Sequence, residues 1–362
     1  MSSDTNPVSP ISSEPVVLSI DAMGGDFGPS VVIDGIYRFF KKNQDVRYII
    51  HGDEALLKPL LAKRHALSER CEIRHCDEVV KMGDKPSHVM RHGQNTSMWS
   101  CIDAVRNKQA EVAVSCGNTG ALMAVSMIRL RKAPGVNRPA IAILWPSSNP
   151  QGSNVMLDVG ADIRAEASDL LQYALMGASY ARNGLNVKCP RIGLLNVGTE
   201  EHKGRIELKE AYERIEEQAA SANFEFVGFV EGGDIPSSKI DVIITDGFTG
   251  NVALKTAEGT ATLVRKLLRE TFKQTPFAML GALLAYGALH RLSKNIDPRR
   301  SNGGVFLGLN GTVVKSHGAA DESGITAAIQ LAYQLAKNGF TDKLAARVAS
   351  SSISNNDIVL KD

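Results

Sequence analysis

The chain has 362 residues, of which 43% are hydrophobic, and its formal net charge is +2. This is enough apolar material for about two globular domains, and too little positive charge to favour nucleic acid as a partner. The five cysteines form no C-x-x-C pair, so neither a disulfide framework nor a zinc site is indicated. No apolar run reaches the length of a membrane-spanning helix. We therefore expect a globular protein of the reducing cytoplasm.

Residues 1–14 are polar and rich in Pro and Ser, which predicts a disordered tail rather than a signal peptide. From Val16 onward strands and helices alternate, which is typical of a mostly parallel sheet with helices on both faces. The predicted strands are 16–20, 46–51, 71–75, 111–115, 140–144, 154–158, 191–196, 223–230, 240–245, 305–309 and 312–316. The predicted helices are 30–42, 55–66, 97–107, 120–131, 165–182, 203–220, 251–273, 277–292 and 324–337.

Five of these strands run into a polar, glycine-rich turn that opens a helix, at 21–30, 116–120, 198–204, 246–251 and 317–324. In open α/β sheets ligands bind beyond the carboxyl ends of the strands, so we expect the five turns to converge on one crevice. The first backbone N–H groups of a helix are unpaired and lie at the positive end of its dipole. Such a crevice favours phosphate or a developing oxyanion.

Familiar catalytic motifs are missing from the chain. It has no G-x-G-x-x-G after a strand, no P-loop, no G-x-S-x-G and no H-E-x-x-H, so we expect neither a cofactor nor a metal. This pattern suits a substrate that brings its own nucleophile, such as phosphate attacking a thioester, because the enzyme then needs only to bind and orient. The candidate donors and cations on the turns are Asn118, Thr119, Lys203, Asn251, Lys255 and His317.

The segment 271–295 is an apolar helical stretch with small residues inside it and basic residues at its flanks. Basic flanks around an apolar helix suit an anionic membrane surface or an acidic partner. A dimer-interface or core helix is the alternative, and the two can coexist in one helical hairpin.

Eight motifs in order resemble the PlsX family of phosphate acyltransferases, over a match that runs from Val16 to about Leu335. The motifs are Asp21-Ala-Met-Gly-Gly-Asp26, Cys116-Gly-Asn-Thr-Gly-Ala-Leu122, Arg138-Pro-Ala140, Leu157-Asp-Val-Gly160, Leu194-Leu-Asn-Val-Gly198, Glu201-His-Lys-Gly204, Thr245-Asp-Gly-Phe-Thr-Gly-Asn251 and Lys315-Ser-His-Gly318. The chain departs from the family pattern at Cys116, at Asp162 and at Gly198-Thr-Glu200.

The resemblance implies a three-layer α/β/α fold like that of isocitrate and isopropylmalate dehydrogenases, with a mostly parallel sheet and two subdomains flanking a cleft. It implies one catalytic unit over 15–340, which includes the segment 271–295, and a C-terminal tail at 341–362. The implied activity is transfer of a long-chain acyl group from acyl-carrier protein to inorganic phosphate, for phospholipid synthesis. The implied partners are a second copy of the chain and a membrane glycerol-3-phosphate acyltransferase, with peripheral contact at the inner face of the membrane.

Roles can then be hypothesised for individual residues. The catalytic residues would be Lys203, Asn251 and His317; phosphate would lie on Asn118, Thr119 and Gly120; Asp21, Asp246 and Lys255 would contact substrate; Leu283, Leu284 and Arg291 would meet the membrane or the carrier. A short-chain phosphotransacetylase that uses coenzyme A thioesters is the main alternative. A non-catalytic binder of phosphoryl ligands is a second, and a dehydrogenase of the isocitrate type is a weaker third.

Overall fold

The computed structural model describes residues 15–200, 202–296, 303–341 and 343. The predicted tails lie outside the described residues, apart from positions 341 and 343. The strands are β1 (Val16–Asp21), β2 (Val46–Gly52), β3 (Cys71–His75), β4 (Val112–Ser115), β5 (Ala140–Pro146), β6 (Ser153–Leu157), β7 (Arg191–Leu195), β8 (Glu225–Val230), β9 (Val242–Ile244), β10 (Gly304–Leu307) and β11 (Thr312–Lys315). They match the predicted strands in order and in number, because most are short apolar runs bounded by turn residues.

All eleven strands form one sheet, in the order β3-β2-β1-β4-β11-β10-β5-β6-β9-β7-β8. The expectation of a mostly parallel α/β sheet is confirmed, and among the described strands the antiparallel pairs lie at the centre, where β10 lies beside β11 and β5 and where β5 pairs with β6. These central reversals make the parallel set β3 to β11 run opposite to the parallel set β6 to β8. The carboxyl ends of the two sets therefore lie at opposite ends of the sheet.

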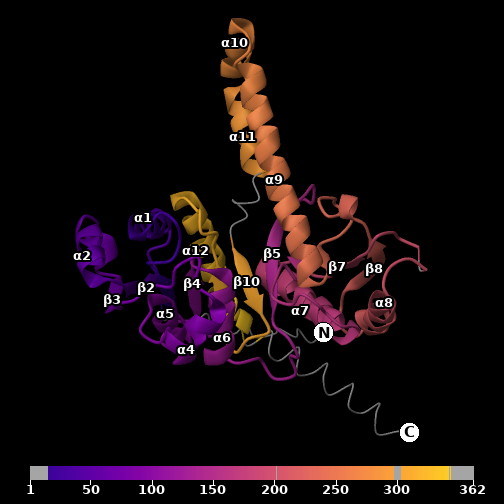
Figure 1. Cartoon of the computed structure of the whole chain (residues 1–362), viewed down its shortest axis with the longest axis horizontal. Helices are drawn as coiled ribbons and strands as arrows, with labels where there is room; N and C mark the ends of the chain where they lie inside the picture. Colours follow the sequence, from indigo (N-terminus) through magenta and orange to yellow (C-terminus); the bar gives the residue numbers. More distant parts are fainter. Residues whose placement is uncertain (1–14, 201, 297–302, 342, 344–362) are drawn as a thin grey trace, which may run out of the picture.

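The helices are α1 (Pro29–Phe40), α2 (Glu54–Ala62), α3 (His65–Ser68), α4 (Pro86–His92), α5 (Ser97–Arg106), α6 (Thr119–Arg129), α7 (Ala167–Leu185), α8 (Ile206–Ala219), α9 (Gly247–Phe272), α10 (Pro276–Leu284), α11 (Tyr286–Ile296) and α12 (Glu322–Lys337). They cover both faces of the sheet (Figure 1). The largest apolar cluster joins the sheet to α1, α7, α8 and α12, and a second cluster joins the other face to α5 and α6. The short helix α4 was not predicted from the sequence.

Helix α9 begins on the sheet and then leaves the body of the protein, with α10 at its far tip and α11 returning beside it (Figure 1). The prediction of one helix over 277–292 is wrong, because the chain breaks at Ala285 between α10 and α11. Gly281 and Gly287 flank the break, and glycine costs about 1 kcal/mol relative to alanine inside a helix, which weakens continuity there. No helix in the described part of the chain is long and apolar enough to cross a membrane.

Candidate active site

A cleft of about 570 Å³ lies over the middle of the sheet. Its floor comes from β5, β10 and β11, and its walls come from α6 and α9. Five of the predicted site residues line it: Thr119, Gly120, Asn251, Lys255 and His317. The predicted convergence of the turns is correct for three of the five, since the turns at 116–120, 246–251 and 317–324 all contribute residues to this lining, and it is wrong for the turns at 21–30 and 198–204, which contribute none. The first turns of α9 contribute Asn251, Leu254, Lys255 and Glu258 to the cleft.

The five turns instead form two groups. The turn after β1 contacts the turn after β11 through a hydrogen bond from the Asp26 amide to the Gly318 carbonyl, 2.8 Å long. The turn after β7 contacts the turn after β9 through an ion pair between Arg205 and Asp246. In the second group the turn after β7 supports the start of α9 through this ion pair, while the turn after β9 contributes Asn251 to the cleft.

Asn118 caps the start of α6, and its side chain is occupied by protein contacts. Its Oδ1 accepts from the Ala121 amide at 3.0 Å, and its Nδ2 donates to the carbonyl of Met82 at 2.7 Å and to that of Asp84 at 3.1 Å. These bonds hold the loop before α4 against the first turn of α6. Thr119 and Gly120 of that first turn face the cleft, where helix N–H groups favour an anion.

The start of α9 packs against the loop that follows β6. Asp246 caps the helix by accepting from the Thr249 amide at 2.8 Å. Gly247 and Gly250 allow close approach: a Cβ added at Gly250 would lie 1.9 Å from the Asp158 carbonyl oxygen. This contact places Asn251 and Lys255 in the cleft, where Lys255 forms an ion pair with Glu258 at 2.9 Å.

We expect Gly250→Ala to lower the free energy of unfolding by about 1–3 kcal/mol or more, because overpacking against backbone has little room to relax. Gly259→Ala is the matched control on the same helix, since nothing lies within 4 Å of a Cβ added there. That control should instead stabilise the protein by about 1 kcal/mol through helix propensity. Thermal unfolding of both variants measures the difference, and equal melting temperatures would contradict the close contact at Gly250.

The loop after β6 is held by a buried carboxylate. Asp158 accepts hydrogen bonds from four backbone amides, those of Ile141, Val159, Ala161 and Asp162, at 2.6–2.9 Å. Burial raises the pKa of Asp158 to about 6, against the effect of these bonds. Asp162, where the chain departs from the family pattern, is also buried, and it accepts from Arg138 at 2.6 Å and from the Tyr173 hydroxyl at 3.1 Å. The Asp162 carboxylate is thus paired with Arg138, and Asp162 is not among the residues that line the cleft.

Lys315, at the end of β11, is a buried lysine for which the sequence predicted no role. Lys315 lines the cleft, and its Nζ donates to the Cys116 carbonyl at 3.4 Å and to the carbonyl of Ser316. Burial lowers the pKa of Lys315 to about 8. His317 lies two residues after Lys315, and the Nδ1 of His317 accepts a hydrogen bond from the Ala319 amide at 3.1 Å. A lysine that ends a buried apolar strand was the available signal, because lysine is almost never fully buried without a partner.

Three other predicted residues do not line the cleft. Lys203 forms an ion pair with Glu200 at 2.8 Å in the turn after β7. Asp21 is buried between β1 and β4, where it accepts from the hydroxyls of Ser97 and Ser115, both at 2.7 Å, and burial raises its pKa. Asp246 serves as the cap of α9. Each of these side chains is already bound to neighbouring protein groups that hold the turns in place.

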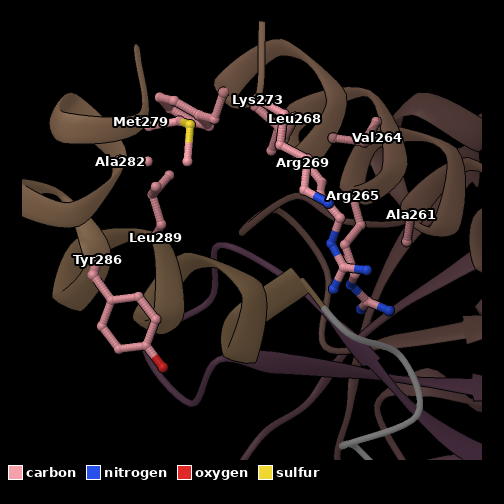
Figure 2. Close-up of a pocket in the computed structure, with 11 residues that line it drawn as sticks. Ala261, Val264, Arg265, Leu268, Arg269, Lys273, Met279, Ala282, Tyr286 and Leu289 are labelled. Carbon is pink, nitrogen blue, oxygen red and sulfur yellow. The ribbon is translucent and has the colours of Figure 1, made fainter. Parts of the chain in front are cut away.

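The projecting helices carry the residues predicted to meet the membrane or the carrier. Leu283 and Leu284 on α10 are 71% and 82% exposed, and Arg291 on α11 is exposed. Between α9 and the pair α10 and α11 lies an apolar pocket of about 460 Å³. Figure 2 shows Met279 and Leu289 on one side of it and the basic side chains Arg265 and Arg269 on the other. The tip therefore combines an exposed apolar surface with cations farther down the helices.

The sequence matches a family model described as "Fatty acid synthesis protein" over residues 16–343. The phosphate acyltransferase of Jannaschia sp. (strain CCS1) is 68% identical over 335 residues, which cover 92% of each chain. That of Ruegeria pomeroyi (strain ATCC 700808 / DSM 15171 / DSS-3) is 65% identical over 342 residues, covering 94% of this chain and 92% of the relative.

Two solved structures share the fold. The EutD phosphotransacetylase from Staphylococcus aureus aligns with a TM-score of 0.58 at 12% identity, covering 90% of this chain and 96% of its own. A phosphotransacetylase from Streptococcus pyogenes aligns with a TM-score of 0.59 at 15% identity, covering 89% of this chain and 94% of its own.

Proposed function

This chain belongs to the fatty acid synthesis protein family, and from that premise we propose that it transfers a long-chain fatty acyl group from the thioester of acyl-carrier protein to inorganic phosphate. It is an acyltransferase of the phosphate acyltransferase type. The observation that carries the proposal is the cleft, where a helix N-terminus, an amide and two lysines face one space. The acyl phosphate product serves phospholipid synthesis.

Phosphate lies at the first turn of α6, on Thr119 and Gly120. Its negative charge is balanced by Lys315, which is buried beside that turn, and by Lys255 across the cleft. Anions are favoured at a helix N-terminus, and charge-assisted hydrogen bonds are about twice as strong as neutral ones. Asn118, Asp21 and Asp246 are positioning residues, because their side chains hold the turns that carry these groups. Lys203 takes no part in the proposed chemistry.

The reaction needs no nucleophile from the protein. A phosphate oxygen attacks the thioester carbonyl carbon, and the carbonyl oxygen becomes an oxyanion that the Asn251 amide stabilises. The C–S bond then breaks, the carbonyl reforms as acyl phosphate, and the thiolate leaves and takes a proton. His317, which also lines the cleft, is placed to supply that proton. A thiol with a pKa of about 8.5 is a good leaving group, so the demands on this residue are modest.

The test is release of free carrier thiol from palmitoyl-acyl-carrier protein, with and without inorganic phosphate and with no metal added. Phosphate-dependent release, with acyl phosphate formed in equal amount, is the expected result. Acetyl-coenzyme A serves as competitor, and turnover of that thioester alone would replace the proposal with a short-chain phosphotransacetylase. Phosphate binding without turnover of either thioester would instead indicate a binding protein.

We further propose that two copies of the chain associate and that the projecting helices α9 to α11 rest on the inner face of the cytoplasmic membrane. The exposed Leu283 and Leu284 at the tip, with basic residues such as Arg291 behind them, support this placement. Apolar burial and attraction to anionic lipid add together in such interfacial helices. The position brings acyl phosphate close to a membrane glycerol-3-phosphate acyltransferase. The two halves of the sheet then act as subdomains on either side of the cleft.

Replacing Leu283 and Leu284 together by aspartate is expected to abolish sedimentation with vesicles that contain anionic phospholipid. Two exposed leucines contribute about 1.5–3 kcal/mol each when fully buried, and the new carboxylates are repelled by the lipid charge. Ile206→Asp is the control, because Ile206 is 69% exposed at the start of α8, near the base of α9 and not at the tip that α10 forms. Retained sedimentation of the double variant, with an unchanged melting temperature, would rule out the tip as the contact.

A further inference from the structure

The polar groups occupy only part of the cleft, and the remainder is an apolar strip. On α6 the positions Thr119, Met123 and Met127 are four apart and line the cleft together. They therefore lie on one face of the helix, and Met127 is about 12 Å along the helix axis from Thr119 at 1.5 Å per residue. The strip thus begins beside the phosphate end of the cleft and continues away from it.

Strand β5 supplies the matching floor. Ile141, Ile143 and Trp145 alternate along the strand, so they lie on the same face of the sheet, and all three line the cleft. Gly304 of the neighbouring strand has no side chain to cover this floor, and a Cβ there would lie 3.1 Å from Ile141 Cγ2. The floor is therefore apolar, and the side chain of Ile141 packs closely over Gly304.

We infer that this strip, bounded by Met123, Met127, Ile141, Ile143 and Leu254, holds the hydrocarbon chain of the acyl group during transfer. The inference rests on the proposed function. It adds where the hydrocarbon chain of the acyl group lies and what limits the length of that hydrocarbon chain. The strip is continuous with the cationic end, so one amphiphilic molecule, with an anionic head and an apolar tail, satisfies both parts of the cleft. Methionine is flexible and polarizable, which suits a chain that varies in length and shape.

Ala124 lines the cleft beside Met123, so enlarging its side chain tests the inference directly. Ala124→Phe is expected to lower kcat/KM for palmitoyl-acyl-carrier protein by about 10-fold or more, since even one methylene in an apolar pocket changes selectivity by about 10–200-fold. The kcat/KM for butyryl-acyl-carrier protein should stay within about 2-fold of its value in the unchanged protein, because the short acyl chain ends before the obstruction. Met127→Trp, at a position 42% exposed, narrows the same strip with less risk to folding.

Ile128→Phe is the matched control, because Ile128 is the next residue on α6, is 44% exposed and does not line the cleft. Its ratio of palmitoyl to butyryl activity should match that of the unchanged protein. If the ratio of palmitoyl to butyryl activity is unchanged in both Ala124→Phe and Met127→Trp, the inference is overturned. This includes the case in which both activities fall equally. The acyl transfer itself would still be established.

A binding measurement separates this inference from the reaction. The chain has two tryptophans, Trp99 and Trp145, so Trp99→Phe leaves Trp145 at the cleft as the single reporter. Dodecyl phosphate is the probe, and it should change the fluorescence of Trp145 in a saturable way that Ala124→Phe weakens. If no thioester is turned over, the proposed function fails and this titration alone decides the inference. No saturable change would overturn the apolar strip as a chain site.

Discussion

Replacing Asn251 by alanine is expected to lower kcat for phosphate-dependent thioester cleavage by about two to three orders of magnitude, the usual cost of one oxyanion-hole donor. The KM for phosphate should change little, because the donor acts on charge that develops only in the transition state. Asn251 faces the cleft at the start of α9, where Gly247 and Gly250 pack the helix closely on the loop after β6. The rigid contact makes the amide a preorganised donor.

Two comparisons make this test specific. Asn251→Asp keeps the shape of the side chain but puts a carboxylate where a donor stood, so its loss should be at least as large. Val252→Ala changes the next residue, which is 50% exposed and does not line the cleft, and it should turn over normally. Wild-type turnover by a folded Asn251→Ala protein would remove the oxyanion role from this residue.

The fold was predictable because its signals are local. Most strands are short apolar runs between turn residues, and most helices show an apolar face, so the sequence alone predicts the order of these elements. Strand direction is not local. The reversals at β10, β5 and β6 depend on which strands pair in the folded protein, and the resulting order places β7, whose turn at 198–204 does not line the cleft, two strands beyond β6.

Site residues were predictable where a hydrogen-bond donor or a titratable side chain stands in a turn after a predicted strand. Thr119, Asn251 and His317 lie in the turns or first helical turns that follow buried strands, and all three line the cleft. The two lysines Lys203 and Lys315 show which information the sequence alone does not contain. Both belong to recognisable motifs, but Lys203 lies three residues from the glutamate it pairs with, while Lys315 is buried by strands distant in the sequence. Burial of this kind is a tertiary property, so the one local signal, a lysine at the end of an apolar strand, does not by itself assign a role.

Replacing Lys315 by methionine is expected to raise the KM for phosphate by about two orders of magnitude, because loss of one partner in a buried charged contact costs about 2–5 kcal/mol. Lys315→Arg keeps the charge at all accessible pH values and should retain part of the binding. Lys266→Met is the control, since Lys266 is exposed on the projecting part of α9 beside Glu270 and should leave the KM unchanged.

The pH dependence of phosphate binding follows from the same residue. Burial lowers the pKa of Lys315 to about 8, so the ammonium is present at neutral pH and is lost as the pH rises through this value. The KM for phosphate should therefore rise between about pH 7 and pH 9.5 in the unchanged protein and stay flat in Lys315→Met. A flat profile in the unchanged protein, together with a normal KM in Lys315→Met, would remove Lys315 from the phosphate site.

Stability should move in the opposite direction to binding. The pKa of Lys315 is about 8 in the folded protein and 10.5 in the unfolded chain, so between these values the unfolded chain holds more protons and the free energy of unfolding rises with pH. The cost of burying the ammonium is fully present at pH 7. Relative to Lys315→Met, the unchanged protein should therefore gain about 2 kcal/mol between about pH 7 and pH 9.5, measured by denaturant unfolding. A cation that destabilises the fold in the pH range where it binds phosphate is the pattern expected of a residue retained for function rather than for stability.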